Sequence, residues 1–182
     1  MALSIGCQKT SDILRMALAH GADEAIHVVH ADEEMLSSMD KVKIIGRIIE
    51  LNPDIRLIAL GKQAIDDDQN QLPQALAGYL NWSQGTFASG LEFGANSQEL
   101  IVSRESDQGI QILSTKLPAI FSADLRLNKP RYVNLQGIMK AKNKPIQVVE
   151  FLTMGIKSSK STSLIENISE PGRNGRNARD IS

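Results

Sequence analysis

Three consecutive aspartates, Asp66, Asp67 and Asp68, follow a short apolar run in the first half of the chain. They belong to the stretch "GKQAIDDDQNQ" (61–71), which lies between the apolar run "IRLIAL" and the helical pattern "PQALAGYL". In an open α/β sheet, ligands bind beyond the carboxyl ends of strands, where loops lead into helices. Gly61 allows close backbone approach, and free N–H groups at a helix start can hold a phosphate. The stretch therefore predicts a nucleotide-type binding loop.

Two other interpretations of the aspartates stay open on pattern alone. The loop can be a solvated turn in which a carboxylate caps the helix and interacts favourably with its dipole, although one aspartate would be enough for that. Alternatively, clustered carboxylates suit Mg²⁺. The chain would then be a small nucleotide-binding or metal-dependent nucleotide-hydrolysing α/β protein that uses Asp66, Asp67 and Asp68. A P-loop is excluded, because Lys62 is not followed by Ser or Thr at the required spacing.

The segments that lead up to this loop alternate between strand and helix patterns. The predicted strands are 2–7, 24–29 and 55–60, and the predicted helices are 10–21 and 41–51. Gly21 and Pro53 provide the helix stops. Strands that alternate with helices pair in parallel through helical crossovers. The fold class is therefore α/β, with a three-layer, open, mostly parallel sheet.

The pattern changes after residue 83. Short runs separated by Gly, Asn and Asp turns predict an antiparallel β appendage, in which Leu100 and Val102 alternate with Ile101 and Ser103. A strand pattern at 117–128, a Pro-containing loop at 128–134 and a short helix at 135–144 follow. We expect one α/β domain over 1–154 and an extended polar C-terminal tail over 155–182.

Composition limits the classes of function. Apolar residues make up 42% of the 182 residues, which is enough for a core, and the net charge of −1 argues against a general nucleic-acid or membrane-surface role. The single cysteine, Cys7, excludes an internal disulfide. No run approaches the ~20 apolar residues of a membrane span and no secretory signal is present, so we expect a soluble intracellular protein. His20, His27 and His30 lack metal-ligand spacing, and no catalytic motif names an enzyme.

Two long stretches resemble a known family. "GKQAIDDDQNQ...AGYLNWSQGTFAS" and "LPAIFSADLRLNKPRYVNLQGIMKAKNKPI" closely resemble the electron-transfer flavoprotein beta subunit, and "LRMALAHGADEAIHV" also fits that family. The resemblance covers most of residues 1–150. It implies an adenine-nucleotide-binding, Rossmann-like fold.

The resemblance implies a non-catalytic electron carrier subunit. In that family an alpha and a beta subunit form a heterodimer whose FAD is held mainly by the alpha subunit, while the beta subunit buries a structural AMP. The flavin accepts electrons from acyl-CoA and related dehydrogenases and passes them to the respiratory chain through a membrane quinone oxidoreductase. The expected location is the bacterial cytoplasm or the mitochondrial matrix.

Under this resemblance the aspartates belong to a buried nucleotide site, not to a magnesium-dependent hydrolase. The family's AMP-binding loop corresponds to Gly61, Lys62, Gln63, Ala64, Ile65, Asp66, Asp67, Asp68, Gln69, Asn70 and Gln71. Leu72 stands where the family commonly has a hydroxyl-bearing Thr, so one polar contact differs.

The segment from Ala123 to Lys144 resembles the family's recognition loop, which docks onto dehydrogenases, and Leu135 falls on the position of its anchoring leucine. The docking residues implied are Arg131, Tyr132, Leu135, Ile138, Met139 and Lys140. A single apolar anchor rimmed by charge is typical of a hot spot. The alternative is that Leu135 begins an inward helix stripe with Ile138 and Met139.

The chain also departs from the family pattern. Family members usually carry a further strand, a hairpin and a helix before the equivalent of Ala2, and that part supplies the central strand of the sheet and part of the AMP pocket. We therefore expect an N-terminally incomplete beta subunit in which the neighbours of that strand are left unpaired. The C-terminal "SEPGRNGRNARDIS" does not continue the family pattern.

Overall fold

A computed structural model describes residues 1–30, 36–65 and 68–157. The strands are β1 (Ala2–Gly6), β2 (Ala25–Val29), β3 (Leu57–Gly61), β4 (Ser83–Phe93), β5 (Glu99–Ser106), β6 (Gly109–Lys116), β7 (Ala119–Ala123) and β8 (Ile146–Glu150). The α-helices are α1 (Ser11–His20), α2 (Ser38–Leu51), α3 (Leu72–Leu80) and α4 (Leu135–Asn143), and the short 3₁₀ helices are η1 (Gln8–Thr10) and η2 (Phe151–Met154).

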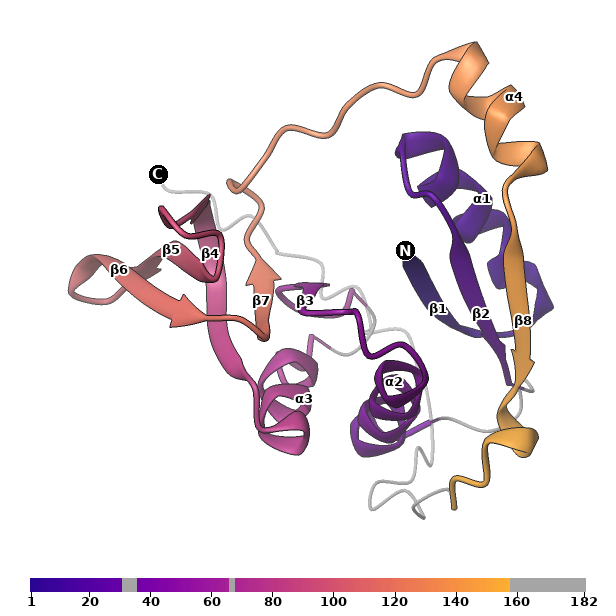
Figure 1. Cartoon of the computed structure of the whole chain (residues 1–182), viewed down its shortest axis with the longest axis horizontal. Coiled ribbons are helices and arrows are strands. Elements are labelled where there is room, and N and C mark those ends of the chain that lie inside the picture. Colours follow the sequence, from indigo (N-terminus) through magenta and orange to yellow (C-terminus); the bar gives the residue numbers. More distant parts are fainter. Residues whose placement is uncertain (31–35, 66–67, 158–182) are drawn as a thin grey trace, which may run out of the picture.

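The described strands form two sheets. One has the order β1-β2-β8 with every pair parallel, and the other has the order β3-β7-β4-β5-β6. In the second sheet β3, β7 and the first part of β4 run parallel, whereas β4, β5 and β6 pair antiparallel. The predicted α/β class with a mostly parallel sheet and an antiparallel appendage is confirmed. Figure 1 shows the two sheets on either side of a gap, with β1 and β3 as the facing edges.

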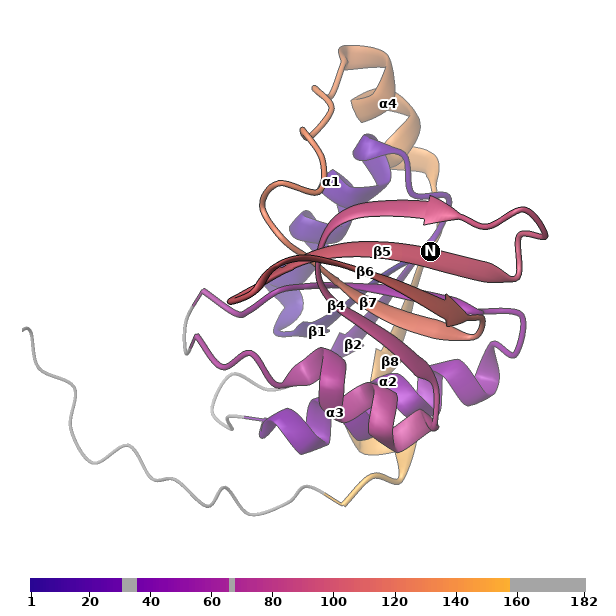
Figure 2. The ribbon, with the colours of Figure 1, turned by 90° about the vertical axis from the view of Figure 1, so that its left-hand side faces the viewer.

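Helices cover the parallel strands in layers. On one face of the β1-β2-β8 sheet, Leu14 and Leu18 of α1 pack with Ala25 of β2 and Ala141 of α4. On its other face, Ile26 and Val28 of β2 pack against α2. Figure 2 shows α2 and α3 together below the strands of the second sheet.

Helix α2 contributes to the core of both sheets. Its buried residues divide into two groups. Ile44 and Ile48 join the cluster around Ile26 and Val28, whereas Val42, Ile45 and Ile49 join the cluster around Leu76 and Ile120. A helix that buries two opposite sides must be apolar over most of its circumference. The isoleucine-rich sequence of α2 therefore follows from its place between the sheets.

Several boundaries differ from the sequence prediction. Helix α2 begins at Ser38, not at residue 41, because Ser37 and Asp40 form a reciprocal capping box in front of it. Strand β7 ends at Ala123, so residues 124–128 belong to the following loop. Strand β8 is not predicted by the sequence pattern; it pairs parallel with β2.

None of the helices in the described part of the chain is long and apolar enough to cross a bilayer.

Candidate functional site

The predicted nucleotide loop lies where the sequence pattern places it. Strand β3 ends at Gly61, which is in register with Ala123 at the end of β7, and α3 begins at Leu72. The loop therefore runs from the carboxyl end of a parallel strand into a helix N-terminus. Pro73 lies in the first turn of α3, and Gln71, at the N-cap, makes no side-chain capping hydrogen bond. The side chain of the cap residue therefore accepts no hydrogen bond from the first amide groups of α3.

The loop makes hydrogen bonds among its own residues and with the first turn of α3. The side-chain amide of Gln63 donates to the Asp68 carboxylate, and Asp68 has a positive φ of 54°. The Gln71 N–H donates to the Gln69 carbonyl at 2.7 Å, and the Gln74 side chain donates to the Asn70 side-chain oxygen at 3.2 Å.

Several loop side chains point into solvent. Gln63, Ala64, Ile65, Asp68, Gln69 and Gln71 are exposed, whereas Lys62 and Asn70 are half-buried. Asp66 and Asp67 lie outside the described residues. No group of three or more His, Cys, Asp or Glu side chains that could hold a metal occurs in the ranges described, but two of the three aspartates are not among them.

Charged side chains meet beside the loop at the ends of β3, β5 and β7. The Lys62 ammonium lies 3.3 Å from the Asp124 carboxylate and 5.3 Å from the centre of the Phe87 ring. Arg126 donates to Asp124 from its Nε at 3.1 Å, and two of its guanidinium nitrogens donate to Glu105. The network ties the start of the β7–α4 loop to the strand that carries Glu105. The sequence pattern does not predict this network, because Lys62, Glu105 and Asp124 are far apart in the chain.

This network gives a pH prediction. Hydrogen bonds from Arg126, with a smaller contribution from Lys62, hold the pKa of the Asp124 carboxyl below its ordinary value. A carboxyl with a lowered pKa in the fold adds stability above its unfolded pKa, about 3.9, and loses it as the pH falls through the folded pKa. The stability difference between the wild type and Asp124→Asn should therefore stay constant from about pH 5 to 8 and shrink below about pH 4. Urea unfolding at a series of pH values measures it, and a difference that already vanishes near pH 6 would contradict the assignment.

The predicted docking residues lie on α4 and on the loop before it. Leu135, Ile138 and Met139 are 72, 43 and 62% exposed, and Arg131, Tyr132 and Lys140 are also exposed. The buried side of α4 is made by Ala141. Leu135, Ile138 and Met139 therefore do not form an inward stripe, and that alternative is wrong. We call these three residues the α4 apolar face.

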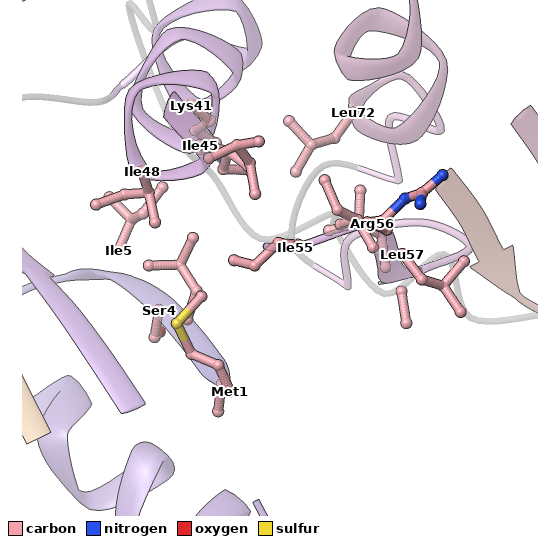
Figure 3. A pocket seen from close by; sticks show the side chains of 16 residues that line it. Met1, Ser4, Ile5, Lys41, Ile45, Ile48, Ile55, Arg56, Leu57 and Leu72 are labelled. Atoms are coloured by element: carbon pink, nitrogen blue, oxygen red, sulfur yellow. The ribbon is translucent and has the colours of Figure 1, made fainter. Parts of the chain in front are cut away.

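A groove lies between the facing edges of the two sheets. Its volume is about 790 Å³, and Figure 3 shows side chains from β1, α2 and the segment around β3 around it. The residues that line it are mostly apolar: Met1, Ala2, Leu3, Ile5, Ile45, Ile48, Ile49, Ile55, Leu57, Ile58, Ala59, Leu60 and Leu72, with Ser4, Lys41 and Arg56 as the polar exceptions. Among the described strands, β1 pairs only with β2 and β3 pairs only with β7. The groove is therefore bordered by two open strand edges.

The family model described as the electron transfer flavoprotein domain matches residues 1–153. The chain belongs to the electron transfer flavoprotein family. The match includes the loop after β3, the α4 apolar face and both edges of the groove.

The related proteins of this family are named as beta subunits. The chain is similar to "Electron transfer flavoprotein subunit beta, mitochondrial" of Oryza sativa, at 48% identity over 162 residues that cover 87% of this chain and 63% of the rice protein. It is similar to electron transfer flavoprotein subunit beta of Homo sapiens, at 42% over 175 residues that cover 95% of this chain and 68% of the human protein. The Dictyostelium discoideum subunit is also 42% identical, with 96 and 68% covered. The chain thus spans a little under two thirds of the rice protein.

Proposed function

We propose that this chain is the beta subunit of a heterodimeric electron transfer flavoprotein and that it acts as a carrier subunit without catalysis of its own. The observation that carries the proposal is the family match over residues 1–153. Together with an alpha subunit that holds most of an FAD, the protein takes electrons from acyl-CoA and related dehydrogenases. It delivers them through a quinone oxidoreductase to the respiratory chain. The location that fits is the mitochondrial matrix or a bacterial cytoplasm.

We assign a structural AMP to the loop Gly61–Gln71. The position of this loop, between a parallel strand and a helix N-terminus, supports the assignment, because first-turn N–H groups lack intrahelical acceptors and favour anions. The Gln71 N–H already donates to Gln69. We therefore expect the phosphate to accept hydrogen bonds from the amides of Leu72 and Gln74, since Pro73 has no N–H.

The nucleotide itself tests this assignment. The full chain, assembled with an electron transfer flavoprotein alpha subunit, should release one AMP per heterodimer when it is denatured, as measured by chromatography of the supernatant. Release of no nucleotide would contradict the AMP site. Magnesium-dependent turnover of ATP would instead support the nucleotide-hydrolysing alternative that uses Asp66, Asp67 and Asp68.

Asp68→Ala should weaken AMP binding about tenfold. The substitution removes the hydrogen bond that the charged Asp68 carboxylate accepts from Gln63 within the loop. Asp68→Asn should retain more affinity, since Asn tolerates the positive φ better than Ala does. Asp54→Ala is the matched control, because Asp54 is an exposed aspartate on the loop before β3, away from its carboxyl end. Equal AMP affinity in Asp68→Ala and Asp54→Ala would refute a role for Asp68.

We assign dehydrogenase docking to α4 and the loop before it, through Arg131, Tyr132, Leu135, Ile138, Met139 and Lys140. The exposure of three large apolar side chains on one short helix supports this, since apolar side chains of this size are usually covered by a partner when they cluster. Arg131 and Lys140, on either side of these apolar residues, fit a partner surface with acidic groups around an apolar pocket.

A further inference from the structure

Helices α1 and α4, although far apart in the sequence, are joined by hydrogen bonds from cations to helix C-termini. The Arg15 guanidinium, in the middle of α1, donates to the carbonyl oxygens of Ala141 and Lys144 at the end of α4, at 2.8 and 2.7 Å. In the reverse direction, the Lys144 ammonium donates to the carbonyl oxygens of Leu18 and Ala22 at the end of α1, at 3.4 and 2.5 Å. Each helix therefore supplies a cation to the other helix's last carbonyls.

These contacts are favourable for a specific reason. The last carbonyls of a helix have no intrahelical donor, and they carry the negative end of the helix dipole. The Leu18 and Ala141 carbonyls also accept backbone hydrogen bonds from Gly21 and Lys144, both at 3.3 Å. The cations add charge-assisted hydrogen bonds to these helix ends and fix where the two ends lie relative to each other. Arg131 adds a third contact of this kind, since it donates to the His20 carbonyl at 3.1 Å.

The first turn of α4 also lies close to the backbone of α1. A Cβ atom at Gly137 would lie 3.0 Å from the Ala19 carbonyl oxygen, so the backbones approach closely there. Leu14, Leu18 and Ala141 form the buried apolar contact between the helices. Figure 1 shows α4 beside α1, at the end of the long loop from β7 and ahead of β8.

We propose that Arg15 and Lys144 are positioning residues that set the orientation of the α4 apolar face. Neither side chain belongs to that face. They act through the placement of α4 on α1, and a docking partner would then meet Leu135, Ile138 and Met139 in one fixed arrangement. The proposal rests on the docking role given under the proposed function.

The first test measures the placement of α4 without any partner. Spin labels at Met16→Cys on α1 and Gln136→Cys on α4, in a Cys7→Ser chain assembled with the alpha subunit, report the distance between the helices. Arg15→Met with Lys144→Met should broaden this distance distribution clearly. Lys142→Met is the charge-matched control, because Lys142 is an exposed lysine on the same helix, and it should leave the distribution narrow. An unchanged distribution in the double variant would overturn the proposal.

The second test measures docking, as the rate of flavin reduction by an acyl-CoA dehydrogenase. Arg15→Met with Lys144→Met should slow the reaction about tenfold, the scale of coupling between residues that act as one unit. Arg15→Lys, which keeps a donor, should recover part of that loss. In a Leu135→Ala background the same two substitutions should lower the rate of flavin reduction by less than about twofold, because the α4 apolar face that Arg15 and Lys144 position is already impaired.

Two results would count against the proposal in different ways. A loss of equal size with and without Leu135→Ala would show that the cations act elsewhere, and the docking role itself would stand. No effect of Leu135→Ala alone would overturn the docking role, and with it the reason to position this face.

Discussion

Residues 1–182 alone should unfold at a lower temperature, and less cooperatively, than the same chain with an added strand that fills the groove between β1 and β3. The two facing edges carry N–H and C=O groups with no partner strand among the described residues. If water enters to satisfy them, it also wets the apolar lining of the groove. If water is excluded, each unpaired group costs about 1–3 kcal/mol, and a domain has a net stability of only about 5–15 kcal/mol. Either case predicts a weak fold and weak AMP binding for the chain without an alpha subunit.

Thermal unfolding of two chains side by side measures this effect. The extended chain carries an N-terminal segment of the family type, about 60 residues, the size of one strand, hairpin and helix. A matched extension has proline at the centre of the added strand, because proline cannot donate to an interior ladder. The first extension should restore a cooperative transition and the second should not. A cooperative transition of equal midpoint in the short and extended chains would show that the short chain closes its sheet in another way.

Leu135→Ala should weaken productive docking of an acyl-CoA dehydrogenase by about 2 kcal/mol or more, which is about thirtyfold. The side chain is 72% exposed in this chain, so its truncation leaves no cavity inside the subunit. AMP content, flavin content and thermal midpoint should not change. The measurement is the rate of flavin reduction as a function of dehydrogenase concentration.

Leu152→Ala provides the matched control for that variant. Leu152 is an exposed leucine on η2, which packs near α2 and away from α4. It should leave the rate unchanged. If Leu152→Ala slows the reaction as much as Leu135→Ala does, exposed leucines act non-specifically and α4 is not the docking element.

The sequence pattern predicts the helices and strands that have a start or stop signal within a few residues of their ends. Gly21 ends α1, as predicted, with a φ of 123°. The apolar periodicity predicts the start of α2 at residue 41, three residues after the observed start at Ser38. Ser37 and Asp40 show the spacing of a capping box, which is the local signal for the true start.

Features set by distant pairing could not be predicted in this way. Strand β8 is five residues long and mostly half-exposed or exposed, so it shows no buried alternation. Strand β4 changes its partner, from β7 in parallel to β5 in antiparallel, around an irregularity between Gly85 and Ala88. The position of the nucleotide loop follows from local pattern, but the ion network beside it and the Arg15–Lys144 contacts join residues that are up to 129 positions apart.

The place of α2 between the two sheets determines how the two sheets are connected. Within each sheet, hydrogen bonds hold neighbouring strands about 4.8 Å apart. Between β1 and β3 no such ladder occurs in the described chain, and α2 packs against both sides, with Ile44 and Ile48 toward one sheet and Val42, Ile45 and Ile49 toward the other. The side chains of α2, and not backbone hydrogen bonds between strands, therefore connect the core of one sheet with the core of the other across this line. A substitution that shortens the side chains of α2 should therefore disturb both cores together.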